Sequence, residues 1–120
     1  MITVPAGVRI HLALGATDMS KGLDGLSLLV QEVLRQDPFS GHLFTFRGKR
    51  ANRIKLLFYD QNGMCLFMKR LDQGMFTWPS TQPTVDGASS IVLSPAQMSM
   101  LLEGVEWRKP VRPRQLMVAS

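Results

Sequence analysis

The sequence has few of the residues that build disulfides, metal sites and membrane spans. Cys65 is the single cysteine among 120 residues, so an internal disulfide is excluded and we expect a reducing, cytoplasmic environment. His11 and His42 are the two histidines, and no cysteine or aspartate stands at ligand spacing from either, so we expect no metal and no cofactor. No apolar run approaches the roughly 20 residues that cross a bilayer, and the N-terminus lacks the pattern of a signal peptide. We therefore expect no membrane association.

Catalytic motifs are missing as well. The run "RGKRAN" lacks the second glycine and the GK[ST] ending of a phosphate-binding loop, and no nucleophile-elbow sequence is present. Asp18, Asp24 and Asp60 could be combined into a nuclease-like carboxylate triad, but Asp18 also fits a helix N-cap and Asp60 a turn. We predict that the protein is not an enzyme and has no small-molecule substrate.

Acidic residues are fewer than basic ones, and the excess is unevenly distributed. The net charge is +5, from 14 basic and nine acidic residues. Residues 47–80 hold seven basic and two acidic residues, a net of +5, and the last 13 residues hold four basic residues and no acidic one. A charge concentrated in this way favours a polyanionic partner over uniform solubilisation.

The hydrophobic pattern predicts five strands and two helices in one domain. Period-two alternation and β-rich apolar runs predict strands over 8–14, 42–47, 53–60, 64–71 and 90–93, with a further short edge strand in "GMFTWP". A longer helix is expected to end at Asp37 before Pro38, and to start either at a cap among Thr17, Asp18 and Ser20 or near Asp24. Ser94, Pro95 and Gln97 form a capping box that predicts a second, short helix.

These elements predict an α+β fold with an antiparallel sheet of four to five strands, one longer helix and one short helix. We expect a single domain over residues 1–107 and a basic, proline-containing tail over 108–120. The small-residue stretch 80–90 predicts a mobile loop.

The stretch "FRGKRANRIK", residues 46–55, holds five basic residues and no acidic one, and the following strand adds Lys69 and Arg70. A type I′ turn at Asn62-Gly63 would place Lys55 opposite Arg70, whereas a turn at Gln61-Asn62 would place Arg53 opposite Arg70. Both registers bring basic side chains together on adjacent strands. Like charges directly opposite each other destabilise a sheet unless an anion such as a phosphate lies between them.

This hairpin is the predicted nucleic-acid-binding site. Its basic residues are Arg47, Lys49, Arg50, Arg53, Lys55, Lys69 and Arg70. The alternative is that these side chains extend into water and protect a sheet edge from aggregation. Aromatic residues on the strands would suit single-strand binding by stacking, but their alternation with aliphatic residues fits core packing better.

Several strings together resemble a known family. They are "TDMSKGLDGL", "DPFSG", "FRGKR", "CLFMKRL" and "EGVEWR". They are similar to the small accessory protein encoded by the second reading frame of the sixty-sixth family of bacterial insertion sequences. This TnpB-type protein is distinct from the RNA-guided nuclease of the same name. The resemblance covers residues from about 4 to 108, and Lys21, Arg47, Lys69 and Arg70 fall on family-like basic positions.

The resemblance implies participation in transposition beside a separate transposase that carries the DNA-cutting chemistry, and it transfers no catalytic residues to this chain. We therefore expect a non-enzymatic accessory protein that binds DNA through the basic hairpin, with DNA and the transposase as partners. The alternative is a protein–protein adaptor that docks the transposase through the Met-rich helix "MSMLLEGVEW" and the tail, without touching DNA.

Overall fold

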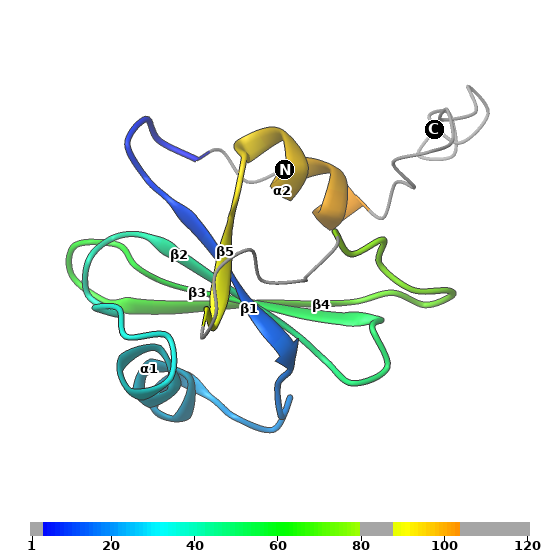
Figure 1. The fold of residues 1–120 in the computed structure, drawn as a ribbon, viewed down its shortest axis with the longest axis horizontal. Coiled ribbons are helices and arrows are strands. Elements are labelled where there is room, and N and C mark those ends of the chain that lie inside the picture. The colour runs from blue at the N-terminus through cyan, green and yellow to red at the C-terminus, as the bar shows by residue number, and fades with distance from the viewer. Residues whose placement is uncertain (1–3, 80–87, 104–120) are drawn as a thin grey trace.

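The computed structural model describes residues 4–79 and 88–103, which form one five-stranded sheet with a helix on each face (Figure 1). The elements in chain order are β1 (Ile10–Ala16), α1 (Leu23–Glu32), β2 (Leu43–Arg47), β3 (Arg53–Tyr59), β4 (Met64–Arg70), β5 (Ser90–Leu93) and α2 (Pro95–Glu103). The strand order is β4-β3-β2-β1-β5. The α+β class is confirmed, whereas the predicted tail over 108–120 and most of the loop over 80–90 lie outside the described residues.

The sheet is mixed rather than wholly antiparallel. Three of the four strand pairs are antiparallel as expected, but β1 and β2 run parallel, with Ile10 beside Leu43 and Leu12 beside Thr45. The reason is that α1 lies between these two strands in the chain and carries it back across the sheet, so that β2 starts at the same end as β1. The period-two pattern of a strand contains no information on its direction.

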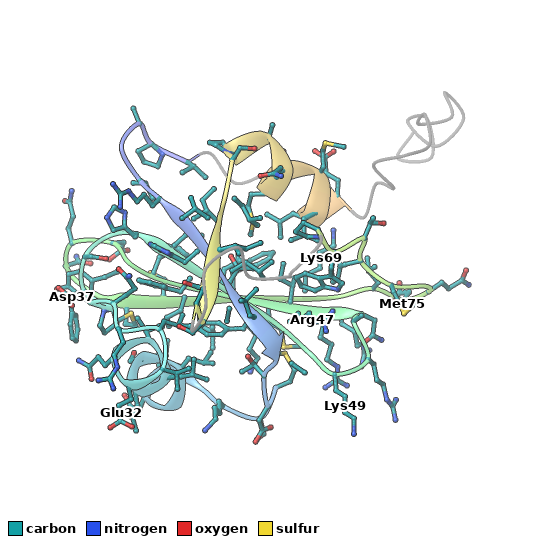
Figure 2. All side chains as sticks on the ribbon, in the orientation of Figure 1. Glu32, Asp37, Arg47, Lys49, Lys69 and Met75 are labelled. Carbon is teal, nitrogen blue, oxygen red and sulfur yellow. The ribbon has the colours of Figure 1, made fainter. Side chains whose placement is uncertain are left out.

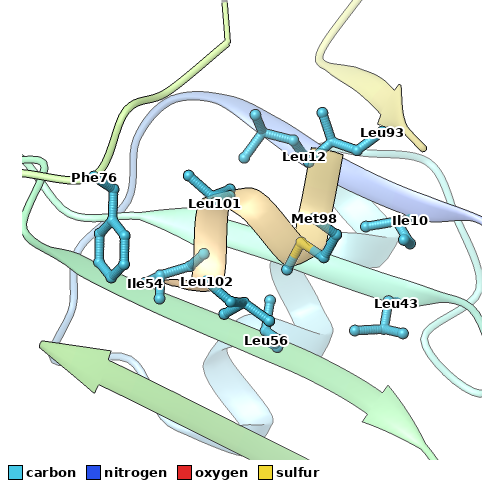
Figure 3. Close-up of a cluster of buried hydrophobic side chains, with 10 residues drawn as sticks. All are labelled: Ile10, Leu12, Leu43, Ile54, Leu56, Phe76, Leu93, Met98, Leu101 and Leu102. Carbon is cyan, nitrogen blue, oxygen red and sulfur yellow. The ribbon is translucent and has the colours of Figure 1, made fainter. Parts of the chain in front are cut away.

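Two hydrophobic cores lie on the two faces of the sheet, which explains why the central strands are apolar on both sides. The core under α1 consists of Ala13, Leu26, Val30, Leu34, Phe44, Phe46 and Leu57. The core under α2, drawn in Figure 3, consists of Ile10, Leu12, Leu43, Ile54, Leu56, Phe76, Leu93, Met98, Leu101 and Leu102. Adjacent residues of one strand therefore belong to different cores, as Leu56 and Leu57 do.

The predicted start of α2 agrees with the structure, whereas α1 is shorter than the longest helix that the sequence allowed. The capping box of α2 is confirmed, because the Gln97 N–H donates to Ser94 Oγ at 3.1 Å and the Ser94 N–H donates to Gln97 Oε1 at 2.8 Å. Helix α1 starts later than a cap at residues 17–20 would require, with Gly22 as an N-cap that makes no side-chain bond. It also ends before Asp37, because Arg35 adopts a left-handed φ of 56° that interrupts the helical path.

The β3–β4 hairpin adopts the second of the two expected registers. Arg53 lies opposite Arg70, so the loop residues are Gln61 and Asn62, and the type I′ turn at Asn62-Gly63 is not formed. Gln61 has a φ of 88°, and the Asp60 carboxylate accepts the N–H of Gly63 at 3.0 Å. The side chain of Asp60 thus stabilises a turn one residue earlier than the Asn-Gly pair indicates.

His11 is buried on the α1 face, where its ring stacks on Phe44 at a centroid distance of 5.2 Å and its Nε2 has no hydrogen-bond partner within the described residues. Burial lowers the pKa of His11 below 6.5, and the electrostatic effects of the neighbouring His42 and Arg9 lower it further. Below about pH 6.5 the unfolded chain therefore binds more protons at this residue than the folded chain does.

We expect the thermal unfolding temperature to fall when the pH is lowered from about 7 to about 5, and to fall less in His11→Phe, which keeps the stack on Phe44 and cannot be protonated. Circular dichroism melts of both proteins at matched ionic strength measure this difference. Equal losses in the two proteins would show that protonation of His11 does not destabilise the fold.

Candidate nucleic-acid interface

The predicted basic residues divide into an exposed set and a set that is held by the fold. Lys49, Arg50, Arg53 and Arg70 are exposed, Arg47 and Lys69 are half-buried, and Lys55 is buried. The four exposed residues come from the β2–β3 turn, the start of β3 and the end of β4, which meet at one end of the sheet. We call these four residues the basic end. Figure 2 shows Lys49 projecting from it, and Lys69 on the side of the sheet that carries α2.

Arg53 and Arg70 face each other directly across β3 and β4. The N–H of Leu71 donates to the Asn52 carbonyl at 2.9 Å, so residues 52 and 71 are a hydrogen-bonded pair. Because such pairs alternate along an antiparallel ladder, Arg53 and Arg70 are a non-hydrogen-bonded pair, the type with the closer side chains. Two exposed arginine side chains thus leave adjacent strands at paired positions on the α1 face, an arrangement of like charges that disfavours the free protein.

A pocket of about 480 Å³ lies beside these arginines. The β1–α1 loop and the β2–β3 turn form its walls, through Thr17, Asp18, Met19, Gly48, Lys49, Arg50, Asn52 and Arg53. Three of the four exposed cations therefore line one concave surface. Sequence reasoning identified the basic wall but missed residues 17–19, which are distant in sequence and join the site through the parallel pairing of β1 with β2.

Gly48 allows the two walls of the pocket to approach. A Cβ at this position would lie 2.9 Å from Met19 Cγ and 3.4 Å from Arg53 Cβ, so a side chain here would push the loop away from the turn. The Thr17 N–H also donates to the Arg47 carbonyl at 2.8 Å, which extends the pairing of β1 and β2 toward the pocket. The glycine inside the basic run was the one sequence signal of this close approach.

The segment 76–78 supports the β2–β3 turn and does not form the predicted edge strand. Ala51 has a left-handed φ of 62°, and its carbonyl accepts both the Phe76 N–H at 2.9 Å and the Trp78 Nε1–H at 3.1 Å. The Arg47 guanidinium lies 6.0 Å from the centroid of the Trp78 ring, at the limit of a cation–π contact. The aromatic residues of "MFTWP" therefore hold the turn in place, and Arg47 lies against one of them.

Lys55 holds the opposite wall of the pocket. Its side chain is 7 % exposed, and its Nζ donates to the Met19 carbonyl at 2.7 Å and to the Lys21 carbonyl at 2.9 Å. These bonds tie the β1–α1 loop to the centre of the sheet. The ammonium group is therefore engaged by backbone carbonyls beneath the surface, whereas the sequence predicted that Lys55 contacts nucleic acid.

Lys69 is also bound to the protein's own backbone. It lies on the α2 face opposite Ile54, and its Nζ donates to the carbonyl of Leu102 in the last turn of α2. A cation at a helix C-terminus satisfies a free carbonyl and interacts favourably with the helix dipole. Lys69 thus contributes to the attachment of α2, on the face opposite to Arg53 and Arg70.

Asp18 adds a negative charge to the pocket. Its carboxylate accepts the backbone N–H of Ser20 at 2.9 Å and the Ser20 hydroxyl at 2.7 Å. The backbone bond, followed by the hydroxyl bond, holds the pKa of Asp18 below its ordinary value. The pocket therefore carries three cations and one anion at neutral pH, and its net positive charge favours an anionic ligand.

A metal centre and a membrane span are two other kinds of site. Among residues 4–79 and 88–103, no group of three or more His, Cys, Asp or Glu side chains is arranged to hold a metal ion. Neither α1 nor α2, nor any other helix in the described part of the chain, has the length and apolar character needed to span a membrane.

Comparisons with known proteins place the chain among transposon-encoded sequences. The family model described as "IS66 Orf2 like protein" matches residues 8–112. Two proteins of Sinorhizobium fredii are similar over most of their length. The uncharacterized protein y4hO is 47% identical over 109 residues, covering 89% of this chain and 90% of y4hO. The uncharacterized protein y4jC is 39% identical over 116 residues, covering 93% of this chain and 95% of y4jC. No solved structure matches the chain significantly.

Proposed function

Because the chain belongs to the IS66 Orf2-like family, we propose that it is a non-enzymatic accessory protein that binds DNA through its basic end and assists a separate transposase. Membership in this family makes the chain a transposition-associated accessory protein. Contact with DNA and help to the transposase are the parts of this function that we infer from the surface of the molecule.

The paired exposed side chains of Arg53 and Arg70 carry this proposal. A sheet that places two cations opposite each other gains stability when a phosphate lies between them, so the pair favours an anionic ligand. Lys49 and Arg50 lie on the adjoining turn and extend the positive surface along the pocket. Four cations on one end of the sheet suit several successive phosphates of a DNA backbone better than they suit one small anion.

In the adaptor alternative, the docking surfaces are the segment 98–107 and the tail over 108–120. Three apolar side chains of α2, those of Met98, Leu101 and Leu102, are buried in the core under that helix. They support the sheet, whereas Met100 on the same helix is half-buried and residues 104–107 of the docking segment lie outside the described residues. The other surface in that hypothesis, the tail over 108–120, lies outside the described residues.

The salt dependence of DNA binding tests the proposed function. Four phosphate contacts predict that the logarithm of the association constant falls with the logarithm of the salt concentration at a slope of about −3.6 on duplex DNA. Fluorescence anisotropy with labelled element-end and scrambled duplexes at several salt concentrations measures this slope. A slope near zero, or no binding to either duplex at low salt, would contradict DNA binding by the basic end.

A further inference from the structure

The outer edge of β4 is the longest free strand edge in the described part of the chain. Strand β4 has seven residues and β5, at the other edge, has four. Among residues 4–79 and 88–103, no backbone group bonds to the outer side of β4. Phe67 is 37 % exposed and Met68 is 51 % exposed, so the free edge also carries apolar side chains.

The devices that usually protect such an edge are missing from the middle of this strand. Residues 64–68, "MCLFM", include no charged residue, no proline and no glycine. The β3–β4 ladder runs without a bulge from Arg53 beside Arg70 to Tyr59 beside Met64. A regular, apolar and uncovered edge is a template for pairing with another strand.

The alternation of hydrogen bonds along β4 determines which of its backbone N–H and C=O groups point away from β3. The Asp60 N–H donates to the Gly63 carbonyl and the Leu71 N–H to the Asn52 carbonyl, so the odd-numbered residues of β4 bond to β3. The even-numbered residues therefore point their N–H and C=O groups outward. These residues are Met64, Leu66, Met68 and Arg70.

From these features we propose that two copies of this chain associate by antiparallel pairing of their β4 strands about a two-fold axis at Phe67. This register pairs Leu66 of one copy with Met68 of the other and Met64 with Arg70, so every outward backbone group finds a partner. The Phe67 side chains of the two copies meet on the α2 face as a non-hydrogen-bonded pair. The two five-stranded sheets become one continuous sheet.

The charges of β4 favour this arrangement over the alternatives. Antiparallel pairing about Phe67 places Lys69 beside Cys65 and Arg70 beside Met64, so no two cations are opposed across the new interface. Parallel pairing would place Lys69 beside Lys69 and Arg70 beside Arg70, which is unfavourable. The basic ends of the two copies then lie at opposite ends of the β4–β4 pair. One dimer would therefore contact two DNA segments. Only this contact with two DNA segments rests on the proposed function; the pairing of the strands does not.

A cysteine at the axis tests the register. In the full-length Cys65→Ser/Phe67→Cys protein the two thiols occupy a non-hydrogen-bonded pair with Cα atoms about 4.5 Å apart, which suits a disulfide. Mild oxidation should convert this protein to a covalent dimer at least roughly tenfold faster than the matched Cys65→Ser/Met75→Cys protein, because Met75 lies in the exposed segment after the strand. In the wild-type protein the two Cys65 thiols are roughly 14 Å apart and should remain unlinked. Equal rates at positions 67 and 75 would overturn the proposal.

The mass in solution provides a second readout. Light scattering should give twice the mass of one chain for the wild type and the mass of one chain for Met68→Pro. Proline at position 68 removes an outward N–H and leaves the ladder to β3 intact, so the folded monomer persists. Circular dichroism confirms that the variant is folded. A wild type that remains monomeric up to submillimolar concentration, or a folded Met68→Pro protein that remains dimeric, would equally overturn the proposal.

Discussion

Replacing Lys55 with alanine is expected to lower the free energy of unfolding by about 3 kcal/mol, because two bonds from a buried ammonium group to backbone carbonyls are lost together. For a chain of this length that change lowers the unfolding temperature by roughly 12 °C. The carbonyls of Met19 and Lys21 lose their partner, and the β1–α1 loop is released from the sheet. Thermal melts of the wild type and the variant measure the effect.

Two variants separate the causes of this loss. Lys55→Met keeps the apolar stem and removes the ammonium group, so its unfolding temperature is expected between those of the wild type and Lys55→Ala. Lys49→Ala removes an exposed lysine of the same pocket and should change the free energy of unfolding by no more than about 0.5 kcal/mol. A Lys55→Met protein as stable as the wild type would show that the two hydrogen bonds contribute nothing.

The salt dependence of DNA binding by Lys55→Met shows whether Lys55 is a structural lysine or a phosphate-binding one. If Lys55 holds the loop and does not contact DNA, folded Lys55→Met keeps the salt dependence of the wild type. If Lys55 were a phosphate contact, the slope would become shallower by about 0.9. A shallower slope without a loss of stability would therefore confirm the prediction that Lys55 contacts DNA.

Lys55 also illustrates how far the sequence predicts the site. Alternation along β3 correctly placed Lys55 and Arg53 on one face, because side chains on a strand alternate between the two faces. What covers that face is decided by a loop more than thirty residues away in the chain, at residues 19–21. Local patterns contain no signal for that contact, so a buried lysine and an exposed arginine appear equivalent in the sequence.

In the fold as well, features set by neighbouring residues were predicted from the sequence, whereas features set by contacts between distant residues were not. Ser94 and Gln97 predicted the start of α2 correctly because a capping box is complete within four residues. The hairpin register depended on a competition between Asn62-Gly63 and the side chain of Asp60, which the residue types alone left open. The parallel pairing of β1 with β2 required knowledge of where α1 packs, and this pairing brings residues 17–19 to the pocket.

Arg53 and Arg70 give the basic end a property that an ordinary charged surface lacks. Their repulsion acts in the free protein and is relieved when a phosphate binds, so the pair affects stability and DNA affinity in opposite directions. Charged side chains that only keep a protein soluble do not affect stability and DNA affinity in opposite directions. Removing both charges is therefore a sharper test of function than removing charge in general.

The double variant Arg53→Ala/Arg70→Ala is expected to bind duplex DNA on the order of 100-fold more weakly at low salt, with a slope that changes from about −3.6 to about −1.8. Its unfolding temperature should equal or slightly exceed that of the wild type, since the like-charge pair is gone. The matched control is Arg9→Ala/Arg35→Ala, which removes the same charge. Arg9 precedes β1 at the opposite end of the sheet from the β2–β3 turn, and Arg35 follows α1.

The control should keep the wild-type slope and lose little affinity, because phosphate contacts act locally and net charge acts weakly through salt. Anisotropy titrations of the three proteins on one duplex, with melts of the same samples, give both readouts. If the two double variants lose affinity equally, binding follows net charge and the basic end has no special role. If Arg53→Ala/Arg70→Ala binds as the wild type does, the opposed arginines are a solvated surface, and the DNA-binding proposal loses the observation on which it rests.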